Sequence, residues 1–250
     1  MRKYLFFLGI ICLVGCSSTE KKQEQAQLYL QMGTSHISNG NYPFALRDLL
    51  MAEELDPKSA VIQNNIGLTY FLRERYDLAE KHLLKAIELQ PKYTDARNNL
   101  ARVYIEQNKF VLAQQQIKIV LDDLTYAEIE KAYVNLGLLN FNQKKFPQAK
   151  TAFAKAVESQ PDSCLANNYL GRVYFEMKDY KVAAQALDRA VGFCKKQLFD
   201  EPHYYGAITY YRLGDKKRAE ARFEELLNFY PNGNYREKSE GMLQLIRKGL

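Results

Sequence analysis

The strongest constraint on this chain is a series of small residues that recurs about every 34 positions. Gly33, Gly67 and Ala101 are separated by 67 − 33 = 34 and 101 − 67 = 34 residues. The series continues at steps of 36, 34 and 36, and a series of alanines runs in step with it. The first series is completed by Gly137, Gly171 and Ala207, and the second consists of Ala45, Ala79, Ala113, Ala149, Ala183 and Ala219. A constant period of this length predicts stacked units that bury apolar surface only against one another.

Each unit has the pattern of two amphipathic helices, which is clearest over residues 60–92. Ile66 and Tyr70 lie on one stripe of the first helix, and Leu83 lies on the facing stripe of the second. Pro91 ends the second helix because its ring clashes with the preceding turn and it has no N–H to donate. The small residues mark the places where the two helices approach each other closely.

This unit resembles a tetratricopeptide repeat, a helix–turn–helix of 34 residues. The resemblance implies an all-α fold, an α-solenoid of six tetratricopeptide repeats over residues 26–233. Two-residue insertions precede the fourth and the sixth repeat. Residues 234–250 follow the last repeat and predict a C-terminal capping helix.

The N-terminus predicts a secreted, lipidated protein. Residues 1–3 are basic at two positions, and the apolar run over residues 4–14 is too short to span a bilayer about 30 Å thick. Residues 13–16, Leu-Val-Gly-Cys, resemble the bacterial lipobox, which implies a signal peptide over residues 1–15 and a covalent lipid on Cys16. A secretory signal that contains a cysteine by chance is the alternative. Because Ser17 follows the cysteine, the resemblance favours the periplasmic face of the outer membrane of a Gram-negative bacterium.

Residues 16–25 are polar, without apolar periodicity, and predict a short tether between the lipid and the first repeat. The whole chain has a formal charge of +6, which becomes +6 − 2 = +4 when Arg2 and Lys3 leave with the signal. Basic and acidic residues are interleaved, so we expect solvated helix faces and no nucleic-acid partner.

Two of the four cysteines remain after the signal peptide and the lipid are accounted for. Cys164 starts the first helix of the fifth repeat, and Cys194 lies near the end of the second helix. Antiparallel helices bring these ends together, so a disulfide is expected in an oxidising periplasm. Two separate buried thiols are the alternative.

Patterns for catalysis, metals and cofactors are missing from the sequence. The three histidines, His36, His82 and His203, belong to no HExxH or His-acid-Ser arrangement. We therefore expect no enzyme, no catalytic residue, no metal, no cofactor other than the lipid and no small-molecule substrate.

Function is then expected on the inner positions of the first helices. In the first two repeats these positions are unusually apolar, which suits a groove for an amphipathic segment of a protein partner. Asparagines recur there and could bond a partner's backbone. The same apolar residues could instead pack between repeats, and the sequence leaves both assignments open. The predicted partner-binding groove consists of Leu30, Thr34, Ile37, Val61, Asn64, Leu68, Phe71, Leu72 and Asn98.

The lipobox, six repeats and C-terminal helix together resemble the pilotin lipoproteins of type IV pilus secretins. The most similar stretch is residues 124–149, which includes the insertion before the fourth repeat. The resemblance implies an outer-membrane protein that binds secretin subunits and promotes their outer-membrane localisation and multimerisation. A lipoprotein scaffold for peptidoglycan hydrolases and an accessory subunit of the β-barrel assembly machinery are the alternatives.

Overall fold

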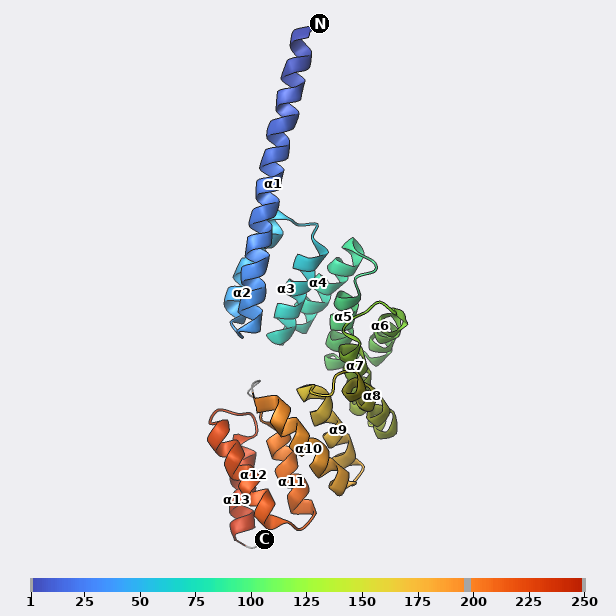
Figure 1. The fold of residues 1–250 in the computed structure, drawn as a ribbon, viewed down its shortest axis with the longest axis vertical. Coiled ribbons are helices and arrows are strands. Elements are labelled where there is room, and N and C mark those ends of the chain that lie inside the picture. Colours follow the sequence, from blue (N-terminus) through green and yellow to red (C-terminus); the bar gives the residue numbers. More distant parts are fainter. Residues whose placement is uncertain (1, 196–198, 249–250) are drawn as a thin grey trace. The chain divides into compact units, whose positions relative to one another are not determined.

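Our computed structural model describes residues 2–195 and 199–248, and it describes side chains from residue 20 onward. Nearly all of these residues are helical. The chain divides into two units, Met1–Asp123 and Leu124–Leu250 (Figure 1). The first unit contains α1 (Arg2–Ser38), α2 (Tyr42–Leu55), α3 (Ala60–Leu72), α4 (Tyr76–Leu89), α5 (Thr94–Glu106) and α6 (Phe110–Asp122). The second contains α7 (Ile129–Asn142), α8 (Phe146–Ser159), α9 (Cys164–Glu176), α10 (Tyr180–Cys194), α11 (Glu201–Arg212), α12 (Lys216–Phe229) and α13 (Arg236–Arg247).

Consecutive helices form antiparallel pairs, from α1–α2 to α11–α12, and each pair is one repeat. Within each unit, the second helix of a repeat also packs against the first helix of the next repeat. The described residues contain no strand. The predicted all-α solenoid of repeats is therefore confirmed.

The recurrent small residues allow the two helices of a repeat to pack closely. A Cβ atom added to Gly67 would lie 2.7 Å from Cγ of Leu83, and one added to Gly137 would lie 2.5 Å from Cε1 of Phe153. Both bulky side chains are fully buried. A side chain at either glycine would therefore displace the core residue that the opposite helix supplies.

The turn between the two helices of a repeat has the same backbone geometry in all six repeats. One residue in each turn has a positive φ, and the next N–H bonds to the carbonyl five residues earlier, as Arg75 does to Tyr70 at 2.9 Å. The residues with positive φ are Gly40, Glu74, Asn108, Lys144, Lys178 and Gly214. These turns lie along one side of each unit, which we call the turn edge.

The last helix, α13, closes the C-terminal end of the second unit. Leu243 and Ile246 are buried against Phe223 of α12, while most of the remaining helix surface is polar. A terminal helix with one apolar and one polar face is what a stack of repeats needs to end in water. The structure places this helix within the predicted range 234–250.

Residues 16–25, expected to form a short tether, are helical and belong to the continuous helix α1. Glu, Lys and Gln fill residues 20–25 and have high helix propensity. They extend a helix that the first repeat already holds, so no new nucleation is needed. Ten helical residues span about 15 Å. The side chain of Cys16 lies outside the described part, so its lipidation stays a prediction.

Among the residues that the structure describes, no helix is both long enough and apolar enough to cross a membrane.

Candidate functional site

The predicted groove residues lie on the first helices of the first three repeats, but they differ in exposure. Thr34 and Val61 are exposed, whereas Leu30, Asn64 and Asn98 are buried. The others are partly buried, namely Ile37, Leu68, Phe71 and Leu72. The structure therefore divides the predicted set into surface and interior residues.

Leu30 is a core residue, and its assignment to the groove is wrong. It packs in one cluster with Leu49, Ile62 and Ile66, and Ile37 packs against the same cluster. These contacts join α1 to α2 and to the first helix of the second repeat. Burying the side chain there contributes roughly 1.5–3 kcal/mol to stability, so a charge at Leu30 would unfold the repeat before it tested any groove.

The sequence suggested that the amide of Asn64 could bond a partner's backbone. In the structure Asn64 uses this amide within the chain. Its Oδ1 atom accepts a hydrogen bond from Nδ2 of Asn99 at 2.9 Å, and its side chain also bonds to Tyr93. Burial raises the pKa of the Tyr93 hydroxyl, which therefore stays protonated. Asn98 is buried beside this linkage. The asparagines thus join repeats, because a buried amide is stabilised only when it is hydrogen-bonded.

The ring of Phe71 is partly covered by its own chain. The guanidinium carbon of Arg102 lies 5.8 Å from the ring centroid, and the ring of Tyr76 lies at the same distance. Arg102 is held in place by Glu106 at 2.9 Å. The apolar inner surface that remains accessible is therefore formed by Val61 with the exposed parts of Leu68 and Leu72.

The sequence reasoning missed a second apolar surface, at the open N-terminal end of the first repeat. Leu28 and Met32 of α1 are 56% and 39% exposed. They occupy the repeat positions of Ile62 and Ile66, which are 2% and 0% exposed because α2 covers them. Both offsets equal the repeat length, 62 − 28 = 34 and 66 − 32 = 34, so the sequence could have shown that Leu28 and Met32 occupy core positions of the repeat. We call Leu28 and Met32 the open end.

The second unit has an inner face dominated by one arginine among aromatic rings. The guanidinium of Arg172 lies 4.9 Å from the ring of Phe141, 5.4 Å from Tyr169 and 4.3 Å from Tyr205. It forms an ion pair with Glu201. Burial is the largest single influence on Arg172 and by itself would lower its pKa. The carboxylate of Glu201 and the neighbouring tyrosines together outweigh burial, so the pKa is raised.

Glu201 also accepts hydrogen bonds from Asn168 at 3.2 Å and from the hydroxyl of Tyr235 at 3.4 Å. Burial and this carboxylate both raise the pKa of Tyr235, so the hydroxyl remains a donor. One carboxylate therefore connects α9 and the segment preceding α13 to α11. The arrangement holds three elements together.

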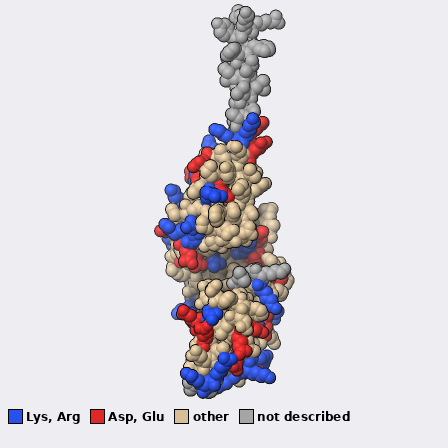
Figure 2. Space-filling model, turned by 90° about the vertical axis from the view of Figure 1, so that its left-hand side faces the viewer, with Lys and Arg blue, Asp and Glu red and all other residues tan. Residues whose placement is uncertain are grey.

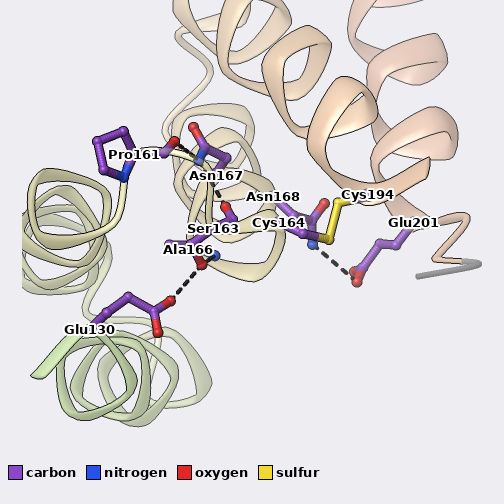
Figure 3. Close-up of a disulfide and its surroundings, with 9 residues drawn as sticks. All are labelled: Glu130, Pro161, Ser163, Cys164, Ala166, Asn167, Asn168, Cys194 and Glu201. Atoms are coloured by element: carbon purple, nitrogen blue, oxygen red, sulfur yellow. Dashed lines mark hydrogen bonds between the residues drawn. A yellow bond between two sulfur atoms is a disulfide. The ribbon is translucent and has the colours of Figure 1, made fainter. Parts of the chain in front are cut away.

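Figure 3 shows the disulfide between Cys164 and Cys194, the pairing expected from the sequence. It joins the first residue of α9 to the last residue of α10 with a Cα–Cα distance of 4.9 Å. Ser163 caps α9 by accepting the N–H of Ala166 at 3.2 Å, and its hydroxyl bonds to Glu130 of α7. The bridge thus lies where consecutive repeats of this unit meet.

The histidines have structural surroundings. His82 pairs through Nδ1 with Gln63 at 2.8 Å and stacks on Tyr70, and burial lowers its pKa. His36 lies 3.5 Å from Asp48. Among the described residues, no three His, Cys, Asp or Glu side chains are placed to hold a metal ion.

The fold and these surfaces are those of a protein that binds other proteins through stacked helix pairs. Models of the tetratricopeptide repeat match residues 60–93, 82–115, 134–197 and 203–233, more than half of the chain. The chain therefore belongs to the tetratricopeptide repeat family.

Two similar proteins come from type IV pilus systems. The type IV pilus assembly protein PilF of Pseudomonas aeruginosa is 27% identical over 200 residues, which are 75% of this chain and 78% of PilF. A solved structure of Pseudomonas aeruginosa PilF matches 89% of this chain and 99% of its own, with a TM-score of 0.69 and 22% identity. The structure of PilW, described as a widely conserved type IV pilus biogenesis factor, covers 88% of this chain and 97% of its own, with a TM-score of 0.73 and 18% identity.

The fold by itself does not indicate pili. A chain of the APC/C hetero-tetramer Cut9–Hcn1 matches 95% of this chain and 46% of its own length, with a TM-score of 0.78 and 17% identity. Function must therefore be argued from the surfaces.

Proposed function

We propose that this protein is a lipid-anchored adaptor of the pilotin type at the periplasmic face of the outer membrane. It binds secretin subunits through an amphipathic segment and promotes their localisation and multimerisation during type IV pilus biogenesis. The lipobox at Cys16, the six repeats and the similarity to PilF over most of both chains support this proposal. It acts by binding and carries out no catalysis.

The observation that carries the proposal is the exposed apolar surface of the first two repeats. At the open end, Leu28 and Met32 present the same positions that, one repeat later, pack beneath a helix. On the inner face, Val61 is exposed and Leu68 and Leu72 are partly so. A helix of the partner with an apolar stripe can cover such positions as α2 covers α3.

The energy available is sufficient for specific binding. Each apolar side chain that becomes fully buried contributes roughly 1.5–3 kcal/mol. Ordering the partner segment and losing its translational freedom offset much of this sum. Several side chains must therefore be covered together, and a charge at any one of them weakens the complex.

Two substitutions test the proposal in cells that assemble the secretin. Leu28→Asp places a charge at the open end, and Val61→Asp places one on the inner face; both residues are exposed, so the fold should survive. We expect at least one of them to abolish secretin multimers on unheated gels while the melting temperature changes little. Leu30→Asp is unsuitable because Leu30 is buried.

Val111→Asp is the matched control, since Val111 is also an exposed aliphatic residue on a helix of the first unit. Secretin multimers should form normally with this variant. If Leu28→Asp and Val61→Asp both remain folded and both support normal multimers, neither surface binds the secretin and the proposal is wrong.

A further inference from the structure

The turn edge of the second unit collects basic residues from three successive repeats. Lys144 and Lys145 lie in the turn between α7 and α8, and Lys178 lies in the turn between α9 and α10. Arg212, Lys216 and Lys217 flank the turn between α11 and α12, and all six side chains are exposed. Figure 2 shows Lys and Arg gathered at the lower end of this unit.

Three acidic residues lie on the same edge: Glu176, which is exposed at the end of α9, and two aspartates that cap helices. Asp179 accepts the backbone N–H of Val182 at 3.4 Å, and Asp215 accepts that of Arg218 at 3.0 Å. Asp215 also pairs with the side chain of Arg218, and hydrogen bonds from Arg218 lower the pKa of Asp215. These carboxylates stay ionised and offset part of the positive charge, but the six cations outnumber the acidic residues, so the edge keeps a net positive charge.

The basic character is not required by the turn itself. The positive-φ position holds Lys144 and Lys178 in the second unit, but Glu74 and Asn108 in the first. Where the first unit has a lysine in a turn, Lys109, it is paired with Glu80 at 2.7 Å. The α3–α4 turn also carries two cations, Arg73 and Arg75, but they flank Glu74, whereas Lys144 and Lys178 place a cation at the positive-φ position itself.

Apolar side chains lie among these cations. Met177 and Leu213 immediately precede the positive-φ residues of the last two repeats and are 40% and 38% exposed. The equivalent residues in the preceding repeats are polar, namely Asn39, Arg73, Gln107 and Gln143. Exposed apolar residues at two adjacent turns, both beside cations, form a pattern that a purely solvated edge does not need.

We propose that the turn edge of the second unit binds the headgroup surface of an anionic phospholipid bilayer, with Met177 and Leu213 entering the interface. The surface of such a bilayer combines negatively charged headgroups, which attract the cations, with an apolar layer beneath them, which can take up Met177 and Leu213. The cations are mostly lysines, which act as point charges and suit a diffuse anionic surface better than a planar, bidentate ligand. They lie on separate turns, which favours an extended surface over an acidic peptide.

The chain contains no tryptophan, so Leu213→Trp introduces a single fluorescent reporter at the edge. The full chain with this substitution is reconstituted into vesicles of phosphatidylcholine, with or without phosphatidylglycerol. We expect a blue shift and quenching by headgroup-proximal spin-labelled lipid only when phosphatidylglycerol is present. Both signals should disappear at about 1 M salt, where the Debye length is about 3 Å.

Charge reversal tests whether the named lysines are responsible. In the Leu213→Trp background, Lys144→Glu, Lys178→Glu and Lys217→Glu together should weaken the membrane-bound state by at least about 100-fold, since each basic residue near the surface contributes about fivefold. Glutamate fits the backbone at the first two positions, because Glu74 already occupies the equivalent place with a φ of 58°. Lys131→Glu, Lys195→Glu and Lys238→Glu reverse three exposed charges away from the turn edge and serve as the matched control.

The proposal is overturned if the tryptophan emission of the Leu213→Trp variant is the same in neutral and anionic vesicles, or if the control triple variant loses the signal equally. A response to soluble poly-glutamate without a response to vesicles also overturns it, since the partner would then be an acidic polypeptide. Secretin multimers are measured separately, so failure here leaves the proposed function standing, and the reverse also holds.

Discussion

His203, a buried residue of α11, makes the second unit sensitive to acid. Its ring contacts Tyr230 at 5.2 Å, and its Nδ1 atom has no hydrogen-bond partner among the described residues. Burial, together with the positive charges of Arg222 and Lys195, lowers its pKa from 6.5 to about 4. The native state therefore binds fewer protons than the unfolded state between these values.

Because the pKa is depressed in the native state, stability from His203 is complete above pH 6.5 and is lost as the pH falls towards 4. The loss amounts to at most about 3 kcal/mol, at 1.36 kcal/mol per unit of pKa. We expect denaturant unfolding of the second unit to show this slope in the wild type and to lose it in His203→Phe. An equal slope in both proteins would contradict the assignment.

At the same scale, the sequence identified core residues better than surface residues. The periodicity located Leu83 and the recurrent glycines correctly, because helix geometry fixes which side chains meet. It could not assign Leu30 or Asn64, since both occupy inner positions and only neighbouring side chains decide whether such a position is covered. Leu28 and Met32 were missed because they align with the core residues Ile62 and Ile66 of the second repeat, and only the position of α2 shows that no helix covers them in the first repeat.

At the scale of elements, Gly67 controls how closely α3 and α4 approach. An alanine there places a Cβ 2.7 Å from Leu83, and the resulting shift should destabilise the first unit by about 1–3 kcal/mol. Gly241 of α13 has nothing within 4 Å of an added Cβ. Gly241→Ala should therefore raise stability by up to about 1 kcal/mol, since alanine favours a helix. Thermal unfolding of the two variants should give shifts of opposite sign.

The disulfide between Cys164 and Cys194 fixes the ends of α9 and α10. It closes a loop with a sequence separation of 30, for which the chain-entropy account gives about 3–4 kcal/mol. We expect a mild reductant to lower the melting temperature of the wild type, and the same reductant to have no effect on the Cys164→Ser/Cys194→Ser double variant. Free alkylation of both thiols in periplasmic material, without reductant, would show that the bond does not form in cells.

The element that the sequence predicted least well is α1. Residues 16–25 have no apolar stripe, and periodicity is the signal on which helix prediction depends. The helix continues through them because the first repeat already holds its C-terminal part and the residues from 20 to 25 have high helix propensity. Local propensity, more than pattern, decides such an extension.

At the scale of the whole molecule, Cys16 decides the proposed location. Cys16→Ser removes the thiol that would accept the lipid, so the precursor should remain uncleaved and leave the outer-membrane fraction. Fractionation with palmitate labelling measures this. A Cys16→Ala variant should behave identically, and normal labelling of either variant would rule out lipidation at this residue.

The first and the last described repeat differ in how much apolar surface they leave uncovered. α13 closes the C-terminal end with a polar outer surface, whereas Leu28 and Met32 leave the N-terminal end uncovered. In a stack of helix pairs, an uncovered apolar end can be covered by one further helix. Each molecule can therefore accept one helix at its open end, and occupancy of that end should saturate at one partner helix per adaptor.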